Sequence, residues 1–250
     1  MKPLTILTGA SKGMGLAMAR HLIGAGGTLV CISRGTNDEL VAEAAKTGAT
    51  LLQWSCDLAD SAVAAARLEA WLDAQSPAVW NSATLINNAG VIPRIGPLAE
   101  AESADLANAL RVGFEAPMQL TSVFLRSTGE WKMPRKVLNI SSGLGRRAMA
   151  SQAAYCASKA AMDHFTRCVA LEEALKPGGA KLCALAPGVI DTGMQAQLRG
   201  ADAAAFPDRG NFVDLKDGGR LASPDDAARS VLAFLKRPDF GSQPVADVRD

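Results

Sequence analysis

The sequence predicts an α/β fold in which one doubly wound parallel sheet of about seven strands has helices on both faces. Short apolar runs rich in β-forming residues alternate with longer alanine-rich segments that carry apolar residues at helical spacing. The short runs are continuously apolar rather than alternating, as expected for strands that are buried on both faces. No linker or change of composition precedes Pro187, so residues 1–250 are expected to form a single domain.

The predicted strands share a core of Leu, Ile, Val and Ala, and most end in small or polar residues. Six strands are located, at 4–9, 28–33, 50–55, 83–90, 135–142 and 180–188. Helical spacing of apolar residues places helices at 15–26, 38–48, 61–75, 105–127, 153–176 and 223–238. Ser223 as N-cap and Pro224 at the first position mark the start of the last helix. Residues 193–221 have weak periodicity, and we expect a loop with one short helix there.

The composition is that of an ordinary globular protein, with 48% apolar and 20% charged residues and a formal net charge of +1. This charge favours neither nucleic acid nor another polyanion as a partner. No apolar run approaches the roughly 20 residues needed to span a bilayer, and the N-terminal stretch is too short and broken for a signal peptide. The five cysteines form no CxxC pair, and the two histidines lack metal-ligand spacing. We expect a cytoplasmic protein with a small-molecule substrate and no metal site.

A glycine-rich turn, "TGASKGMG", follows the first strand and opens the first helix. Glycines there allow the backbone to turn tightly and to approach a pyrophosphate, which then meets the helix N-terminus. Such a turn can also be purely structural, but its position at the first β–α junction favours a nucleotide site. The residues of the turn expected to contact a dinucleotide are Gly9, Ser11, Lys12, Gly13, Met14 and Gly15.

The second predicted strand ends in "CISRG", about 19 residues beyond Gly15, where a dinucleotide fold meets the adenosine ribose. An acidic residue at this place would bind the 2′-hydroxyl of NAD, but this chain has Ser33 and Arg34. Arg34 offers a cationic fork suited to the 2′-phosphate of NADP, and Lys12 can lie against the same phosphate. The sequence therefore predicts NADP(H) as cofactor. The alternative is that Arg34 is a solvent-exposed arginine at a helix start.

The only tyrosine of the chain, Tyr155, is followed four residues later by Lys159. Residues at this spacing share one face of a helix. The pKa of free tyrosine is near 10, and a lysine cation within a few ångströms favours the phenolate and lowers that pKa. We therefore expect Tyr155 to exchange a proton with a substrate oxygen. The alternative is that Tyr155 only packs and Lys159 lies on a solvated face.

Six segments, taken in order, resemble the motifs of the short-chain dehydrogenase/reductase family, and the likeness covers nearly the whole chain. They are the glycine turn, Asp57 in "CDL", "NNAG" at 87–90, "NISSG" with Ser142, "YxxxK" at 155–159 and "PGxxxT" at 187–192. The resemblance implies an NAD(P)-dependent oxidoreductase on a single Rossmann-type domain. The closing region and "PGVIDTGMQ" further resemble sepiapterin reductases and benzil-type carbonyl reductases.

The resemblance also implies roles for individual residues. Ser142 would hold and polarise the substrate oxygen, and Lys159 would bind the nicotinamide ribose. A homodimer or homotetramer is implied as well. Beyond the glycine turn, Ser33 and Arg34, the positions assigned to the dinucleotide are Asp57, Leu58, Asn88, Ala89, Gly90, Tyr155, Lys159, Pro187, Gly188, Ile190 and Thr192.

One position departs from the family pattern, because Gly113 stands where the family's catalytic tetrad has an asparagine. Pro117, four residues later, has no N–H to give to the carbonyl of residue 113. We hypothesise that Gly113 still takes part in catalysis through this carbonyl, by binding a water that touches Lys159. The alternative is a kinked helix with an impaired proton relay.

These residues and the family resemblance together imply an NADPH-dependent reductase of a ketone, diketone or aldehyde, with Tyr155 as the proton donor. The segment at about 193–221 is expected to cover the substrate, and its glycines suggest hinges. Two alternatives remain open. One is a regulator that senses NADP without turning it over, and the other is an alcohol dehydrogenase that works in the oxidative direction.

Overall fold

The computed structural model describes residues 1–250 and is built around one seven-stranded sheet. The strands pair in the order β3-β2-β1-β4-β5-β6-β7, and every neighbouring pair is parallel. The strands are β1 (Lys2–Thr8), β2 (Thr28–Ser33), β3 (Thr50–Ser55), β4 (Trp80–Asn87), β5 (Arg135–Ile140), β6 (Lys181–Ala186) and β7 (Val245–Asp247). The predicted α/β fold with a doubly wound parallel sheet is confirmed.

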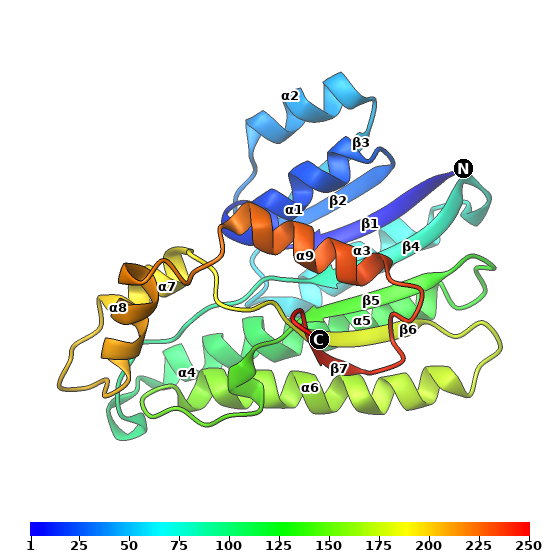
Figure 1. Ribbon diagram of the computed structural model, residues 1–250. Coiled ribbons are helices and arrows are strands. Elements are labelled where there is room, and N and C mark those ends of the chain that lie inside the picture. Colours follow the sequence, from blue (N-terminus) through cyan, green and yellow to red (C-terminus); the bar gives the residue numbers. More distant parts are fainter.

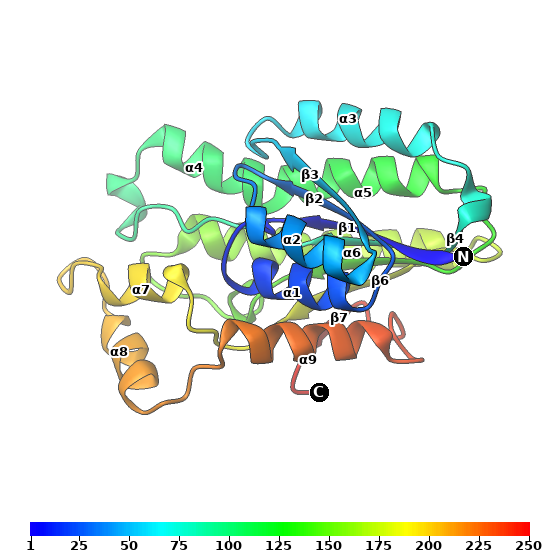
Figure 2. The same cartoon turned by 90° about the horizontal axis from the view of Figure 1, so that it is seen from above.

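Helices cover both faces of the sheet, and each face has its own apolar core. One core packs α1, α2 and α9 against the sheet, and the other packs α3, α5 and α6. Figure 2 shows α3 and α5 on one side of the strands and α9 on the other. The helices are α1 (Gly13–Gly24), α2 (Asp38–Thr47), α3 (Ser61–Asp73), α4 (Ser103–Leu110), α5 (Ala116–Ser127), α6 (Ala153–Ala174), α7 (Gly193–Arg199), α8 (Arg209–Asp217) and α9 (Pro224–Lys236).

The helix expected at 105–127 is present, because the backbone is helical without interruption from Ser103 to Ser127, but a π-helical turn at Arg111–Glu115 divides it into α4 and α5. The amide of Ala116 donates to the carbonyl of Arg111, which is the wider spacing of a π turn. Pro117, in the first turn of α5, has no amide proton to continue the α-helical ladder. The proline therefore accounts for the break, and Gly113 lies at its centre.

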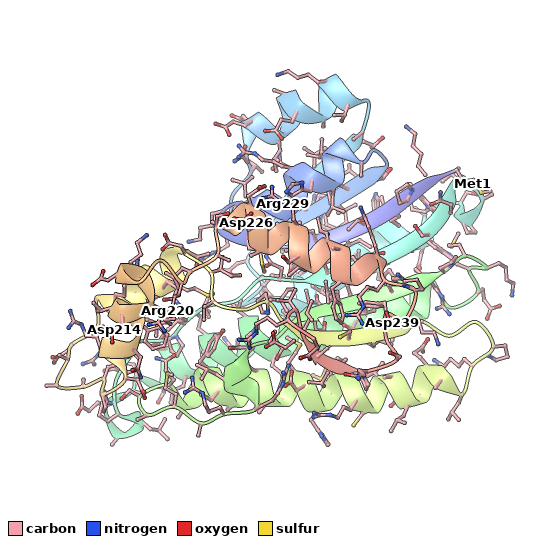
Figure 3. All side chains as sticks on the ribbon, in the orientation of Figure 1. Met1, Asp214, Arg220, Asp226, Arg229 and Asp239 are labelled. Atoms are coloured by element: carbon pink, nitrogen blue, oxygen red, sulfur yellow. The ribbon has the colours of Figure 1, made fainter.

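The segment at 193–221 holds two helices, α7 and α8, rather than the one short helix that was expected. Figure 1 shows the pair at one end of the molecule, beside the sheet. Phe206 and Phe212 stack at 5.6 Å between ring centroids and form a small buried cluster with Met149 and Leu198. This small separate core stabilises the segment. The glycines and the proline of the segment interrupt its helical pattern, so the sequence does not reveal this core. Arg220 donates to the carbonyl of Asp214 near the end of α8 (Figure 3).

None of the helices combines the length and the apolar character needed to cross a membrane. All five cysteines are free thiols. No three His, Cys, Asp or Glu side chains gather in a way that could hold a metal ion.

Candidate active site

The predicted site residues follow the carboxyl ends of six strands. Because all strands are parallel, these ends lie at one edge of the sheet, where α/β folds bind their ligands. The glycine turn follows β1, Arg34 follows β2, Asp57 follows β3, Asn88 follows β4, Ser142 follows β5 and Pro187 follows β6. The fold therefore gathers motifs that are far apart in the sequence.

The glycine turn is packed backbone to backbone against the end of β4. The side-chain amide of Asn88 donates to the carbonyls of Thr8 and Gly9, at 2.9 and 3.2 Å. A Cβ atom on Gly15 would lie 2.0 Å from the carbonyl oxygen of Gly9, and one on Gly9 would lie 2.9 Å from Cα of Ala89. Gly9 also has a φ of +71°. Both positions therefore require glycine for steric reasons.

The start of α1 is suited to bind a phosphate group. No side chain caps its first amides, and its first turn contains no acidic residue. Gly13 has a φ of +57°, and the methyl of Thr192 lies 3.6 Å from the place that a Cβ on Gly13 would take. Free amides and the helix dipole attract an anion at such a terminus. The pyrophosphate of a dinucleotide fits here. The Met14 side chain is buried in the core, so only its backbone can reach such a ligand.

The residues expected near the adenosine differ in what their side chains are free to do. Ser33 is buried, and its hydroxyl accepts from the amide of Ala10 at 2.8 Å, so it holds the turn against β2. Arg34 and Lys12 are exposed. Arg34 bonds inside the chain through its carbonyl, which accepts from Ser55 Oγ at 3.0 Å. Its guanidinium remains available to a 2′-phosphate.

Asp57 and Leu58 lie after β3. One carboxylate oxygen of Asp57 accepts from the amide of Ala59 at 3.0 Å, and the residue is exposed. Leu58 is buried in the core beneath it. The arrangement leaves the second carboxylate oxygen of Asp57 free to accept from an exocyclic amine.

The structure brings Ser142, Tyr155 and Lys159 together. Ser142, the residue before the 3-10 turn at Gly143–Gly145, forms a hydrogen bond with the phenol of Tyr155. The ammonium of Lys159 lies 5.8 Å from the centroid of the Tyr155 ring. It donates to the carbonyl of Ile140 at 2.8 Å. Lys159 is buried, while Ser142 and Tyr155 are half-buried.

The expected acidification of Tyr155 is not found among the protein's own groups. Burial raises the pKa of its phenol above the ordinary value, and the hydrogen bond from Ser142 opposes this only in part. Burial also lowers the pKa of Lys159 to about 8, against the opposing charge of Asp163. The phenol is therefore protonated at neutral pH, and Lys159 is largely charged. Burial of an aromatic hydroxyl is a property of the tertiary fold, which the spacing of two residues does not reveal.

Gly113 lies in the π-helical turn and faces α6 between Tyr155 and Lys159. A Cβ at this position would lie 3.0 Å from Oγ of Ser158, the neighbour of Lys159 in the sequence. Ser158 Oγ in turn donates to the carbonyl of Tyr155 at 2.8 Å. The glycine thus lets the π turn approach the part of α6 that carries the site. A water held by the Gly113 carbonyl stays a prediction.

The segments after β4 and β6 meet above Lys159. A Cβ on Gly90 would lie 3.9 Å from the Lys159 ammonium and 3.5 Å from Cε of Met194, on α7. From Pro187 the chain passes through Gly188, which has a φ of +82°, and Ile190, which forms a β-bridge with Ala222. It then enters α7, which carries Met194. Met194 was not among the predicted site residues. It lies two residues after Thr192, at the start of the segment at 193–221 that was expected to cover the substrate.

A second residue that the sequence reasoning missed is Asp163, which is buried beside Lys159. It repeats the spacing of Tyr155 and Lys159, since it lies four residues further along α6. That repeat was a signal that a third polar group shares the same helix face.

The chain is similar to several known proteins. Residues 4–203 match the family model described as short chain dehydrogenase. The benzil reductase ((S)-benzoin forming) of Bacillus cereus is 37% identical over 94% of this chain and 94% of its own length. The sepiapterin reductase of Meriones unguiculatus is 28% identical over 98% and 95% of the two chains.

A solved structure from Agrobacterium tumefaciens with bound NADP, assigned as a 2-deoxy-D-gluconate 3-dehydrogenase, superimposes with a TM-score of 0.76 at 27% identity. The superposition covers 99% of this chain and 94% of that one. The family match spans most of the sequence, and its motifs meet at one edge of the sheet. The chain belongs to the short-chain dehydrogenase/reductase family of oxidoreductases.

Proposed function

We propose that this protein is an NADPH-dependent carbonyl reductase that acts on a ketone, diketone or aldehyde, with Tyr155 as the proton donor. The observation that carries the proposal is the contact between Ser142 and a half-buried, protonated Tyr155, one helical turn from Lys159. The likeness to a benzil reductase at 37% identity supports a carbonyl substrate.

The coenzyme fits the carboxyl edge of the sheet, and when bound it supplies a hydride to the substrate carbon. The free amides of α1 would hold its pyrophosphate. Arg34 and Lys12, both exposed, would hold the 2′-phosphate that distinguishes NADPH from NADH. Asp57 would bind the adenine, and Lys159 the nicotinamide ribose.

The chain's own residues control the substrate oxygen. Ser142 would donate a hydrogen bond to this oxygen and fix the carbonyl next to the phenol. Tyr155 would transfer its proton to the oxygen as the carbon receives the hydride, so that the product is an alcohol. A phenol with a raised pKa suits this direction, because it is protonated at neutral pH and is ready to donate. Lys159, charged at neutral pH, would stabilise the phenolate that is left.

The cover formed by α7 and α8 supports a substrate with apolar groups next to the carbonyl. Its buried cluster of Met149, Leu198, Phe206 and Phe212 borders the half-buried side chains of Leu144 and Cys156. Leu144 is two residues from Ser142, and Cys156 follows Tyr155. An apolar substituent on the carbonyl would contact this wall.

The same proposal includes a cytoplasmic homodimer or homotetramer. The free state of all five cysteines agrees with a reducing compartment. Leu171 and Leu175 on and just after α6 are 71% and 87% exposed, which suits a surface that a second copy covers. Light scattering on the purified protein measures the assembly directly.

The experiment that tests the function mixes the protein with NADPH or NADH and a panel of aldehydes, ketones and vicinal diketones. Loss of absorbance at the reduced-nicotinamide band, together with isolation of the alcohol, is the expected result with NADPH. Tight NADPH binding without turnover across the panel contradicts the proposal and favours a regulator. Turnover only with NADP⁺ and alcohols favours the oxidative direction instead.

A further inference from the structure

A buried carboxylate next to the site, Asp163, has no role in the mechanism described so far. It lies on α6, four residues after Lys159, and is 2% exposed. Its Oδ1 accepts a hydrogen bond from the hydroxyl of Ser141. Its Oδ2 accepts a hydrogen bond from Nε of Arg146 at 3.1 Å, and the two side chains form an ion pair. Both oxygens are therefore occupied by partners from one short segment.

This segment, residues 140–146, carries Ser142. It is attached to α6 on both sides of that serine. Ile140 accepts from the Lys159 ammonium at 2.8 Å, and Ser141 and Arg146 bind Asp163. The backbone at Gly145 also lies directly on the helix. A Cβ on Gly145 would lie 2.9 Å from the Lys159 carbonyl oxygen and 3.0 Å from Oδ2 of Asp163.

Several charged or titratable groups surround Asp163. Lys159 is on its own helix, and Arg146 faces it from the 3-10 turn region. Cys183 on β6 is close enough for Asp163 and Arg146 to influence its thiol, which burial keeps protonated by raising its pKa to about 12. Asp247 on β7 faces Arg146 and is paired with Arg249.

Arg146 extends the contact to the end of the chain. Its second terminal nitrogen donates to the carbonyl of Ala246, on β7, at 2.8 Å. The guanidinium therefore joins three elements: the turn after β5, helix α6 and the last strand. Taking a carboxylate out of water costs free energy, and the hydrogen bond from Ser141 and the ion pair with Arg146 offset this cost.

We propose that Asp163 is a positioning residue that holds the Ser142 segment on α6 through Ser141 and Arg146 and keeps the Lys159 ammonium charged. This inference rests on the proposed carbonyl reductase function and extends it. Two physical effects are combined. The hydrogen bonds fix the distance between Ser142 and Tyr155, and the negative charge offsets the loss of water around Lys159.

The test compares Asp163→Asn with Glu173→Gln. Glu173 is a matched control, because it is also a buried, ion-paired carboxylate on α6, 2% exposed, but it binds Lys176 and the amide of Ala180 at the far end of the helix. Both substitutions remove one buried negative charge. A loss of stability alone affects both variants, whereas the proposed role affects only Asp163→Asn.

The first readout needs neither coenzyme nor substrate. It is the pH titration of the Lys159 ¹³Cε resonance in ¹³C-lysine-labelled protein, assigned with Lys159→Met. Asp163→Asn is expected to lower the midpoint relative to the wild type, and Glu173→Gln to leave it unchanged. An unchanged midpoint in Asp163→Asn overturns the electrostatic part of the proposal. If the wild type proves to lack reductase activity, this titration still decides that part separately.

The second readout is steady-state carbonyl reduction. Asp163→Asn is expected to lower kcat about 100-fold with a smaller change in KM, since a misplaced Ser142 affects the transition state more than binding. In the pH profile of kcat for this variant, the decline at high pH should shift to lower pH together with the midpoint of the Lys159 titration. Ser141→Ala keeps the charge and removes one hydrogen bond, so kcat should fall with no shift of the Lys159 midpoint. Equal kcat in Asp163→Asn, Glu173→Gln and wild type overturns the positioning role.

Arg146→Gln keeps the proposal testable where Asp163→Asn does not fold. This side chain is 34% exposed, so its replacement disturbs the core less. Removal of a cation on the far side of Asp163 should raise the Lys159 midpoint, which is the opposite sign to Asp163→Asn. A midpoint that falls or does not move in Arg146→Gln contradicts the proposed coupling.

Discussion

Gly113 and Ser158 lie in such close contact that a Cβ on Gly113 would be 3.0 Å from Oγ and 3.2 Å from Cβ of Ser158. The two residues join the π-helical turn to α6 between Tyr155 and Lys159. A side chain at 113 would push against the helix that carries the site. This contact gives the glycine a steric reason that is independent of its carbonyl.

Gly113→Ala is expected to destabilise the protein by about 1 kcal/mol net. Overpacking costs about 1–3 kcal/mol, and the higher helix propensity of alanine offsets about 1 kcal/mol of this. Reductase activity should fall with it. Gly24→Ala is the matched control, since Gly24 lies in α1 with no atom near its would-be Cβ. That variant should be as stable as the wild type or more so in urea unfolding. If Gly113→Ala were as stable and as active as the wild type, α6 would be able to shift enough to accommodate the extra methyl group.

Arg34→Ser is expected to raise KM for NADPH by about 10- to 100-fold, because the variant loses charge-assisted hydrogen bonds to the 2′-phosphate. KM for NADH should change little, because NADH has no 2′-phosphate. Arg229→Ser serves as the control. Arg229 is an exposed arginine on α9 that pairs with Asp225 and Asp226 (Figure 3). A parallel change for both coenzymes would remove Arg34 from the 2′-phosphate site.

Lys159 should make unfolding depend on pH in a definite window. Its folded pKa is lowered to about 8 from 10.5, so the cost of burying its charge is present below pH 8 and is relieved as pH rises toward 10.5. The free energy of unfolding of the wild type should therefore rise by up to about 3 kcal/mol relative to that of Lys159→Met across this window, at about 1.4 kcal/mol per pKa unit. Urea unfolding of both proteins at pH 7 and pH 10 measures the difference. A constant difference would mean that Lys159 titrates normally.

The absorbance of tyrosinate reports on one residue only, because Tyr155 is the sole tyrosine of the chain. Burial raises the pKa of its phenol, so the midpoint in the isolated protein should lie above 10. Ser142→Ala removes the hydrogen bond that favours the phenolate and should raise the midpoint further. A midpoint below 10 in the wild type would instead support acidification by Lys159.

Much of the fold could be predicted from the sequence, because continuous apolar strands and amphipathic helices leave clear periodic signals. The strand β7 was not located, since its three residues, Val245–Asp247, are too few to show a pattern. The division between α4 and α5 was signalled by Pro117, but the sequence does not distinguish a π turn from a simple kink at this place. The helices α7 and α8 depend on Phe206 and Phe212, whose mutual contact no local pattern reveals.

The site divides in the same way. Motifs carried by the chain itself, such as the glycine turn and the Tyr155–Lys159 pair, could be identified by spacing. Properties that arise from burial could not, and the raised pKa of Tyr155 is the main example. Asp163 was missed for the same reason, because an aspartate on a helix is usually exposed and only the fold shows it buried.

The central claim is that the Tyr155 phenol gives its proton to the substrate oxygen. The measurement is the rate of NADPH oxidation with a vicinal diketone by wild type and by Tyr155→Phe, with NADPH binding measured in parallel by fluorescence. Tyr155→Phe is expected still to bind NADPH but to lose at least about 100-fold in kcat, the usual contribution of a positioned proton donor. A Tyr155→Phe protein that reduces the diketone at the wild-type rate would contradict it.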